Sequence, residues 1–113
     1  MLDASTERQE MDAGSLKRMY VVSLTYKVPQ DIVDFHLDAH VDWLQKAFDA
    51  GVFMAAGRKV PRTGGMLLSR ASREELDKSL AQDPFYVNGV AEFDVTEFHA
   101  NRVAEGFENL LDE

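Results

Sequence analysis

The sequence predicts a single α+β domain whose elements follow the order β-α-β-β-α-β. Residues 19–26 and 90–98 are rich in β-branched and aromatic side chains and show the two-residue alternation of strands. A long stretch between them repeats its apolar residues at three- and four-residue steps, which is typical of an amphipathic helix. Ser72, followed three residues later by a glutamate, indicates the start of a second helix.

The first half of the chain supplies a strand and the longer helix. Residues 19–26, MYVVSLTY, form the expected strand, and a proline shortly afterwards breaks it. A helix should then begin at Gln30 or Asp31 and run to about Ala50, where Gly51 provides a stop. One face of this helix carries its large apolar residues, which are Val33, Leu37, Val41, Leu44 and Phe48.

The second half should hold two strands, the second helix, the last strand and a short terminal helix. Their expected bounds are 53–60, 66–70, 72–80, 90–98 and 101–112. Gly57 interrupts the first of these strands, and a turn rich in proline and glycine separates it from the next. The capping pair at Ser72 makes the second helix the best-marked element of this half.

This order of elements predicts a ferredoxin-like fold, with four antiparallel strands and both helices on one face of the sheet. The second face of such a sheet stays uncovered, and several residues expected to point to it are apolar or aromatic. Two sheets packed face to face would bury that surface, and two-fold symmetry is the commonest kind in oligomers. We therefore expect a homodimer.

Composition and charge exclude several classes of function. Twelve Lys and Arg against twenty Asp and Glu give a net charge of −8, which disfavours binding to a nucleic acid. The chain has no cysteine, so disulfides and thiolate ligands are excluded. No apolar run has the length of a membrane span or the form of a signal peptide. We expect a cytoplasmic protein that binds neither membranes nor nucleic acids.

The two ends of the chain differ from its middle. Residues 1–18 hold almost no large apolar side chains and are expected to form a disordered arm. The folded domain should span residues 19–100, and residues 101–113 should form a C-terminal extension that includes the short helix.

Two histidines and an Asp-Pro-Phe corner are the residues best suited to chemistry. His36 and His40 lie one helical turn apart at the border of the apolar stripe, and Asp83-Pro84-Phe85 follows the second helix. A histidine and a carboxylate from distant parts of the chain are the minimum equipment for proton transfer near neutral pH. The structural alternative is that the histidines are ordinary helix residues and that Asp83 caps a turn.

Weaker signals come from a turn and from a third histidine. Gly57 could let the backbone approach a small molecule, or could mark a bulge. Arg58, Lys59 and Arg62 form the only basic cluster, which would attract an anionic substrate or belong to a solvated turn. Four residues could together bind a metal ion, but no HxxE or ExxH spacing supports such a site. They are His36, His40, Asp83 and His99. We favour a site without metal or other cofactor.

Five pieces of the chain occur in an order shared with a known family. They are MYVVSLTY, HLDAHVDWL, AAGRKVPRTGGMLLS, DPFYVNGVA and FDVTEFHA. Together they make residues 19–99 resemble the YCII-related (YciI-like) family. The resemblance implies a dimeric α+β barrel and a His–Asp pair in a cleft. One branch of the family acts as a dehydrochlorinase in chlorinated hydroxyquinol breakdown, and the fold resembles that of muconolactone isomerase.

The resemblance also assigns roles to particular residues. His40, in HVDWL, matches the family histidine and would act as general base or acid. Asp83 matches the carboxylate of the family's Asp-Pro-aromatic corner and would orient the imidazole. The residues expected around the pocket are His36, Trp43, Tyr20, Phe85 and Gly57. Leu37 stands where many members carry an arginine, so no specific reaction is carried over.

We therefore expect a small cofactor-free enzyme of the lyase or isomerase type that uses His40 and Asp83 on a small molecule. The alternative is a dimeric module that binds a small molecule, or serves as an accessory domain, without turnover.

Overall fold

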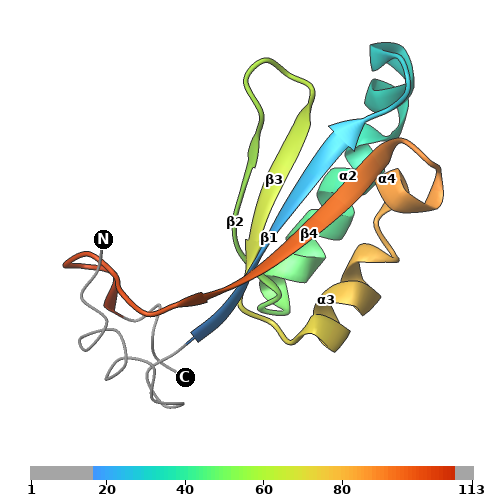
Figure 1. Cartoon of the computed structure of the whole chain (residues 1–113). Coiled ribbons are helices and arrows are strands. Elements are labelled where there is room, and N and C mark those ends of the chain that lie inside the picture. The colour runs from blue at the N-terminus through green and yellow to red at the C-terminus, as the bar shows by residue number, and fades with distance from the viewer. Residues whose placement is uncertain (1–16, 109–113) are drawn as a thin grey trace.

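Four strands form one antiparallel sheet in the order β2-β3-β1-β4, in a computed structural model that describes residues 17–108. The elements are β1 (Lys17–Tyr26), α2 (Gln30–Asp49), β2 (Phe53–Arg58), β3 (Gly64–Ser69), α3 (Arg73–Leu80), α4 (Pro84–Val87) and β4 (Ala91–Ala100). The helices lie on one side of the sheet (Figure 1). The expected α+β fold and element order are confirmed, with α4 as an additional short helix.

The central strand β1 carries the core of the molecule. Its alternate residues Tyr20, Val22 and Leu24 are buried beneath the helices, and Tyr26 packs against the same cluster. The strand begins at Lys17, two residues before the expected start, because it pairs with β4 as far as Ala100. Pairing extends the strand into a segment that has little hydrophobic signal of its own.

Helix α2 has the expected bounds, but it is rotated relative to the predicted apolar stripe. Its buried residues are Val33, Trp43 and Ala47, whereas Val41 remains 50% exposed. Gly51 ends the helix with a φ of +82°, a conformation that suits glycine. The rotation places Leu37 and Leu44 at the border between the core and a cavity, which Val41 also lines.

The segment after β3 contains two capped helices. Ser72 and Glu75 form the expected capping box at α3, with the Glu75 backbone N–H donating to Ser72 Oγ at 3.1 Å. The Asp-Pro-Phe corner, expected as a turn, is the start of the short helix α4, for which Asp83 is the N-cap. Pro84 suits the first position of a helix because its missing N–H would be unpaired there.

The predicted terminal helix is wrong over the residues that the structure describes. Residues 101–108 contain a turn at Glu105 and Gly106 and no α-helix, and residues 109–112 lie outside the described range. Phe107, which should have anchored the helix, is 56% exposed. A helix this short is marginal without a surface on which to pack. Residues 1–16, most of the predicted arm, also lie outside the described range.

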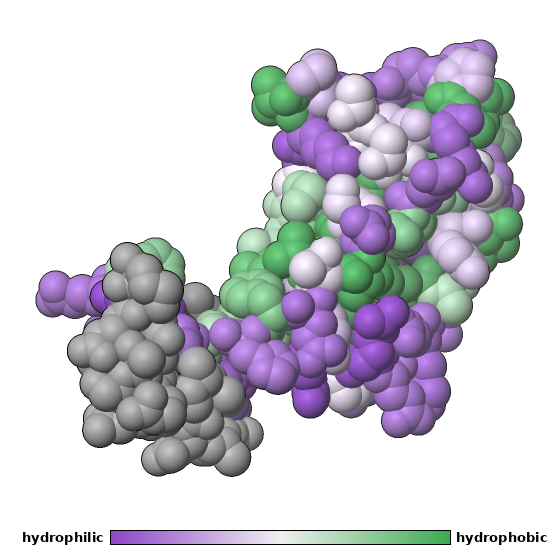
Figure 2. All heavy atoms as spheres, viewed as in Figure 1, coloured by the Kyte–Doolittle hydropathy of each residue, from purple (hydrophilic) through white to green (hydrophobic). Residues whose placement is uncertain are grey.

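The face of the sheet opposite the helices carries no covering element within the described residues. Val21 pairs with Leu68 and Ser23 with Met66, in alternation with the buried residues of β1. Figure 2 shows hydrophobic residues gathered over the strands, with hydrophilic residues around them. Within residues 17–108, no helix is long and apolar enough to cross a membrane.

Candidate functional site

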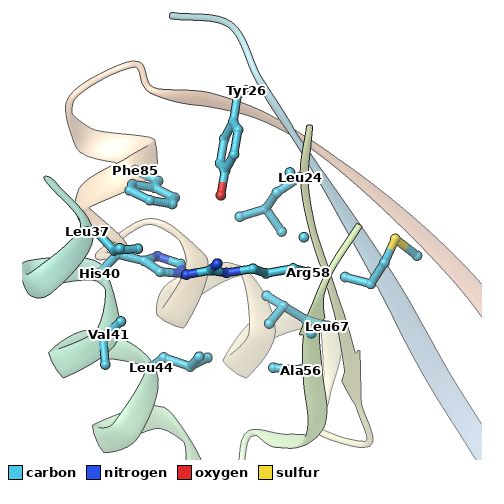
Figure 3. Close-up of a pocket in the computed structure, with 14 residues that line it drawn as sticks. Leu24, Tyr26, Leu37, His40, Val41, Leu44, Ala56, Arg58, Leu67 and Phe85 are labelled. Atoms are coloured by element: carbon cyan, nitrogen blue, oxygen red, sulfur yellow. The ribbon is translucent and has the colours of Figure 1, made fainter. Parts of the chain in front are cut away.

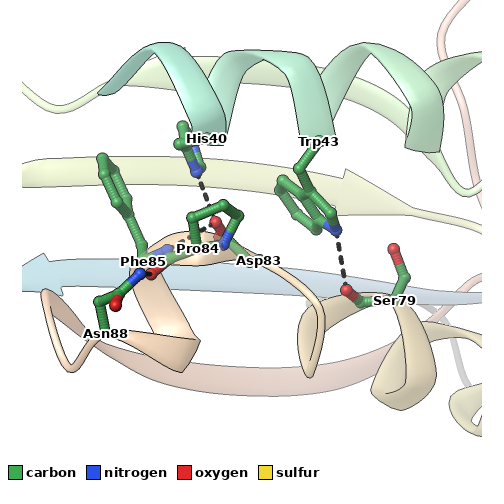
Figure 4. A network of polar contacts seen from close by, with 7 residues as sticks. All are labelled: His40, Trp43, Ser79, Asp83, Pro84, Phe85 and Asn88. Atoms are coloured by element: carbon green, nitrogen blue, oxygen red, sulfur yellow. Dashed lines mark hydrogen bonds and ion pairs between the residues drawn. The ribbon is translucent and has the colours of Figure 1, made fainter. Parts of the chain in front are cut away.

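A single oxygen of Asp83 joins the short helix α4 to the long helix α2. The Phe85 backbone N–H donates to Asp83 Oδ1 at 2.9 Å, and His40 Nδ1 contacts the same oxygen at 2.8 Å (Figure 4). The Asp83 side chain is fully buried, and its Oδ2 has no hydrogen-bond partner within the described residues. The N-cap position therefore fixes the carboxylate that meets the imidazole.

The His40 ring is held by aromatic neighbours as well as by Asp83. It stacks on Phe85 with ring centroids 4.0 Å apart and planes 6° from parallel. Trp43 lies 5.5 Å from the imidazole, and its Nε1–H donates to the Ser79 carbonyl at 2.9 Å, which ties α2 to α3. Only 13% of the His40 side chain is exposed. These contacts leave the imidazole little freedom to rotate.

The contact with Asp83 determines which ring nitrogen of His40 can serve a ligand. A carboxylate only accepts hydrogen bonds, so this contact requires a proton on Nδ1, and the Nδ1–H donates a hydrogen bond to Asp83 Oδ1. In the neutral ring the lone pair is then on Nε2. Nε2 has no hydrogen-bond partner in the described part of the chain, and His40 lines a cavity. The arrangement supplies a positioned base.

The cavity lies between α2, α4 and the sheet and has a volume of about 180 Å³. Its walls are mainly apolar, with Leu24, Leu37, Val41, Leu44, Leu67 and Phe85 among the lining residues. Polar side chains come from three elements, with His40 on α2, Tyr26 at the end of β1 and Arg58 at the end of β2 (Figure 3). Apolar walls with a few convergent polar groups are typical of a small-molecule site.

The basic cluster beside the cavity is partly neutralised. Arg62 donates to Asp34 on α2 at 3.1 Å, and Lys59 Nζ donates to Thr25 Oγ1 at 3.0 Å. Hydrogen bonds from Gln30 and then from Arg62 lower the pKa of Asp34, and the positive charge of Arg58 adds to this effect. Arg58 itself forms no side-chain hydrogen bond or ion pair with any described residue, and its side chain extends across the cavity towards His40 (Figure 3).

A family model of the YCII-related domain matches residues 19–99. The chain belongs to the YCII-related domain family. The matched range runs from the third residue of β1 to the penultimate residue of β4, so it contains nearly all of the sheet and the helices α2, α3 and α4. Comparison with curated protein sequences finds no match.

The YCII-related domain is also similar to a solved structure. That structure is a 5-chloro-2-hydroxyhydroquinone dehydrochlorinase from Burkholderia phenoliruptrix AC1100, in complex with 2,5-dihydroxybenzoquinone. The TM-score is 0.60 at 17% sequence identity, and the match covers 69% of this chain and 90% of that chain. At this identity the similarity concerns the fold alone.

Some of the expected pocket residues of the YCII-related domain line this cavity and others do not. Phe85 and Gly57 line it. Tyr20 lies in the core, with Arg73 Cζ 5.8 Å from the centroid of its ring. Trp43 packs against His40 on the side away from the cavity. His36 is one turn from His40 and contacts Phe35, with ring centroids 5.0 Å apart. One turn of a helix is about 5.4 Å, so His36 lies too far along α2 to contact Asp83 as His40 does.

Tyr26 and Arg58 line the cavity, although neither is among the pocket residues expected from the sequence. Tyr26 follows the same alternation as Tyr20, but six residues separate them, which is about 20 Å along a strand. The sequence feature that could have identified Tyr26 as a pocket residue is its position at the end of the strand, close to the break before the helix. Arg58 belongs to a basic cluster that was expected either to attract an anionic substrate or to form a solvated turn, and it ends β2 on the side of the sheet that faces α2.

The four residues considered as metal ligands are not brought together. His99 pairs with Glu97 at 2.8 Å and lies opposite Arg18, whereas Asp83 contacts His40 near the other end of the sheet. Within residues 17–108, no group of three or more His, Cys, Asp or Glu residues has the geometry to hold a metal ion.

Proposed function

We propose that this protein is an enzyme of the lyase or isomerase type that uses His40 and Asp83 for acid/base chemistry on a small molecule. The observation that carries the proposal is the 2.8 Å contact between His40 Nδ1 and Asp83 Oδ1, with the imidazole at the wall of an apolar cavity. Family membership and the fold shared with a dehydrochlorinase support a lyase-type reaction.

The proposed chemistry is a proton transfer at a carbon atom. His40 Nε2 takes a proton from a C–H bond, and the electron pair of that bond forms a new double bond. In an elimination, a leaving group departs from the adjacent carbon with its own electron pair. In an isomerisation, the imidazolium returns the proton to a different carbon. Asp83 stabilises the imidazolium by accepting its Nδ1–H, and the low polarity of the walls strengthens this attraction.

Turnover of a compound panel tests this function. The panel holds chlorinated hydroxyquinols and unsaturated lactones, followed by product analysis with mass spectrometry and by deuterium incorporation from heavy water. We expect His40→Ala to reduce turnover by about 10²–10⁴-fold, the usual contribution of a general acid or base, while the fold is kept. His36→Ala is the matched control, because His36 lies outside the cavity.

Two results would reject the catalytic role. One is turnover that His40→Ala leaves unchanged, because the reaction would then not need the imidazole. The other is a compound that binds in the cavity without chemical change or deuterium incorporation across the whole panel. The second result would favour a binding module without turnover.

We further propose that two copies of the chain pack through the uncovered faces of their sheets and form a dimeric barrel. The supporting observation is a group of apolar residues on that face, Val21 beside Leu68 and the 39% exposed Met66, next to the polar pair of Ser23 and Asp94. Monomeric proteins rarely leave such a surface in water, and a self-complementary sheet face fits a two-fold interface.

A further inference from the structure

We propose that the ligand of this cavity is a compact monoanion built on a single ring, and that the Arg58 guanidinium binds its acidic group. This proposal rests on the proposed function only in taking the same cavity as the working site. It identifies the chemical class of the ligand and a binding residue, neither of which follows from the contact between His40 and Asp83.

The size and polarity of the cavity limit the ligand. The cavity measures about 180 Å³. An engineered apolar cavity of about 150 Å³ in another protein holds one benzene molecule. The volume therefore suits one six-membered ring with one or two small substituents. Side chains of Leu37, Leu44 and Leu67 offer such a ring apolar contacts and few hydrogen bonds.

The charge of the lining residues determines the sign of the ligand. Arg58 is the only lining residue that is charged at all ordinary pH values, and no Asp or Glu lines the cavity. A cationic ligand would therefore meet no carboxylate among the residues that line the cavity. Lys59 and Arg62, the neighbours of Arg58 in the basic cluster, are engaged by Thr25 and Asp34. The guanidinium of Arg58 remains for a ligand.

The strand pairing leaves Arg58 uncovered on the cavity side. Its pairing partner in β3 is Gly65, which has no side chain to cover the aliphatic part of the arginine side chain. Gly64, the next residue in β3, also lines the cavity. The Arg58 side chain starts on the sheet side of the cavity and extends towards His40 on α2 (Figure 3), so its guanidinium can meet a ligand inside the cavity. A planar guanidinium suits an acidic group that offers two oxygens.

This placement gives Arg58 a defined relation to the proposed chemistry. An anion held between Arg58 and His40 presents the ring of the ligand to Nε2 with a fixed orientation. The positive charge also stabilises negative charge that develops on the ring when a proton leaves. The Tyr26 hydroxyl, which has no hydrogen-bond partner among residues 17–108, points into the same space and can donate to the ligand (Figure 3).

Binding of a charged and a neutral ring of equal size tests the proposal. Benzoate and benzamide are titrated into the full-length protein, and chemical shifts or heats of binding give each dissociation constant. We expect benzoate to bind at least about tenfold more tightly than benzamide, since a charge-assisted hydrogen bond contributes that much or more. In Arg58→Gln the difference should disappear, and Arg58→Lys should restore part of it.

The matched control is Arg102→Gln, which removes the same charge from an exposed position beyond the opposite end of β1. It should leave both dissociation constants unchanged. The proposal fails if the two probes bind the original protein equally well, if neither binds, or if benzoate binds Arg58→Gln as tightly as the original protein. It also fails if Arg102→Gln weakens benzoate as much as Arg58→Gln does, because the effect would then be one of net charge.

This experiment separates the ligand class from the catalytic role. Benzoate binding that needs Arg58, together with turnover that does not need His40, would keep the anion site and reject the acid/base function. Turnover that needs His40, together with benzoate binding that does not need Arg58, would keep the acid/base function and reject the anion site. Neither result depends on the other, because the first readout is equilibrium binding and the second is product formation.

Discussion

One carboxylate oxygen of Asp83 both caps a helix and contacts a histidine. Its Oδ1 accepts the Phe85 N–H, which starts α4, and contacts His40 Nδ1, which holds the imidazole. The sequence had presented these as alternatives, a capping residue or a partner of the histidine. They are compatible because an N-cap carboxylate has more than one lone pair. Folding of the corner and positioning of the base are therefore one event.

Two substitutions of Asp83 separate the cap from the charge. Asp83→Ala removes both hydrogen bonds and should lower the free energy of unfolding by about 1–3 kcal/mol, the cost of unpaired buried groups. Asp83→Asn keeps an oxygen for the Phe85 N–H but loses the negative charge, so turnover should fall by more than stability does. Urea denaturation and product formation measure the two effects.

The control for Asp83 is Asp38→Asn, on the exposed side of α2. It removes the same charge and should change neither quantity beyond about 0.5 kcal/mol, as is usual for surface sites. Equal stability of Asp83→Ala and the original protein would show that the two hydrogen bonds do not contribute to folding.

At the scale of elements, the approach of β3 to β1 depends on a glycine. A Cβ atom at Gly64 would lie 1.7 Å from the Leu24 carbonyl oxygen, far inside van der Waals contact. Leu24 is a backbone neighbour that cannot move without breaking the pairing of Leu24 with Gly65. The same glycine lines the cavity, so close strand pairing and the shape of the site are linked there.

Gly64→Ala should therefore be strongly destabilising. We expect a loss of at least about 1–3 kcal/mol in the free energy of unfolding, the range for overpacked cores, or failure to fold. Gly57→Ala is the control, because a Cβ at Gly57 meets nothing within 4 Å. It should fold and should change stability little. Thermal and urea unfolding compare the two variants, and equal stability would contradict the steric argument.

At the scale of the whole molecule, the described residues form one layer of helices and one bare sheet face (Figure 1), and the proposed dimer depends on that face. Leu68→Glu would place a charge among apolar residues of the proposed interface, beside Val21. We expect this variant to be monomeric, while the original chain is a dimer, by light scattering or sedimentation. Phe35→Glu, at an 80% exposed position on α2, should leave the dimer intact. A monomeric original protein would reject the proposed interface.

The sequence by itself determined the elements and their order, because periodicity and capping act over a few neighbouring residues. The alternation in β1, the helix that ends just before Gly51 and the capping box at Ser72 all appear where local patterns place them. The terminal helix was predicted in the same way and is absent from residues 101–108, since a weak local pattern needs a surface on which to pack.

Tertiary structure alone decided how the site is assembled. The rotation of α2 brings His40, and not His36, against Asp83, and the length of β1 separates Tyr26 at the cavity from Tyr20 in the core. The pairing of β2 with β3 places Arg58 at the cavity, opposite Gly65. These placements join residues that are far apart in the chain, so they depend on how whole elements pack, which no local pattern encodes.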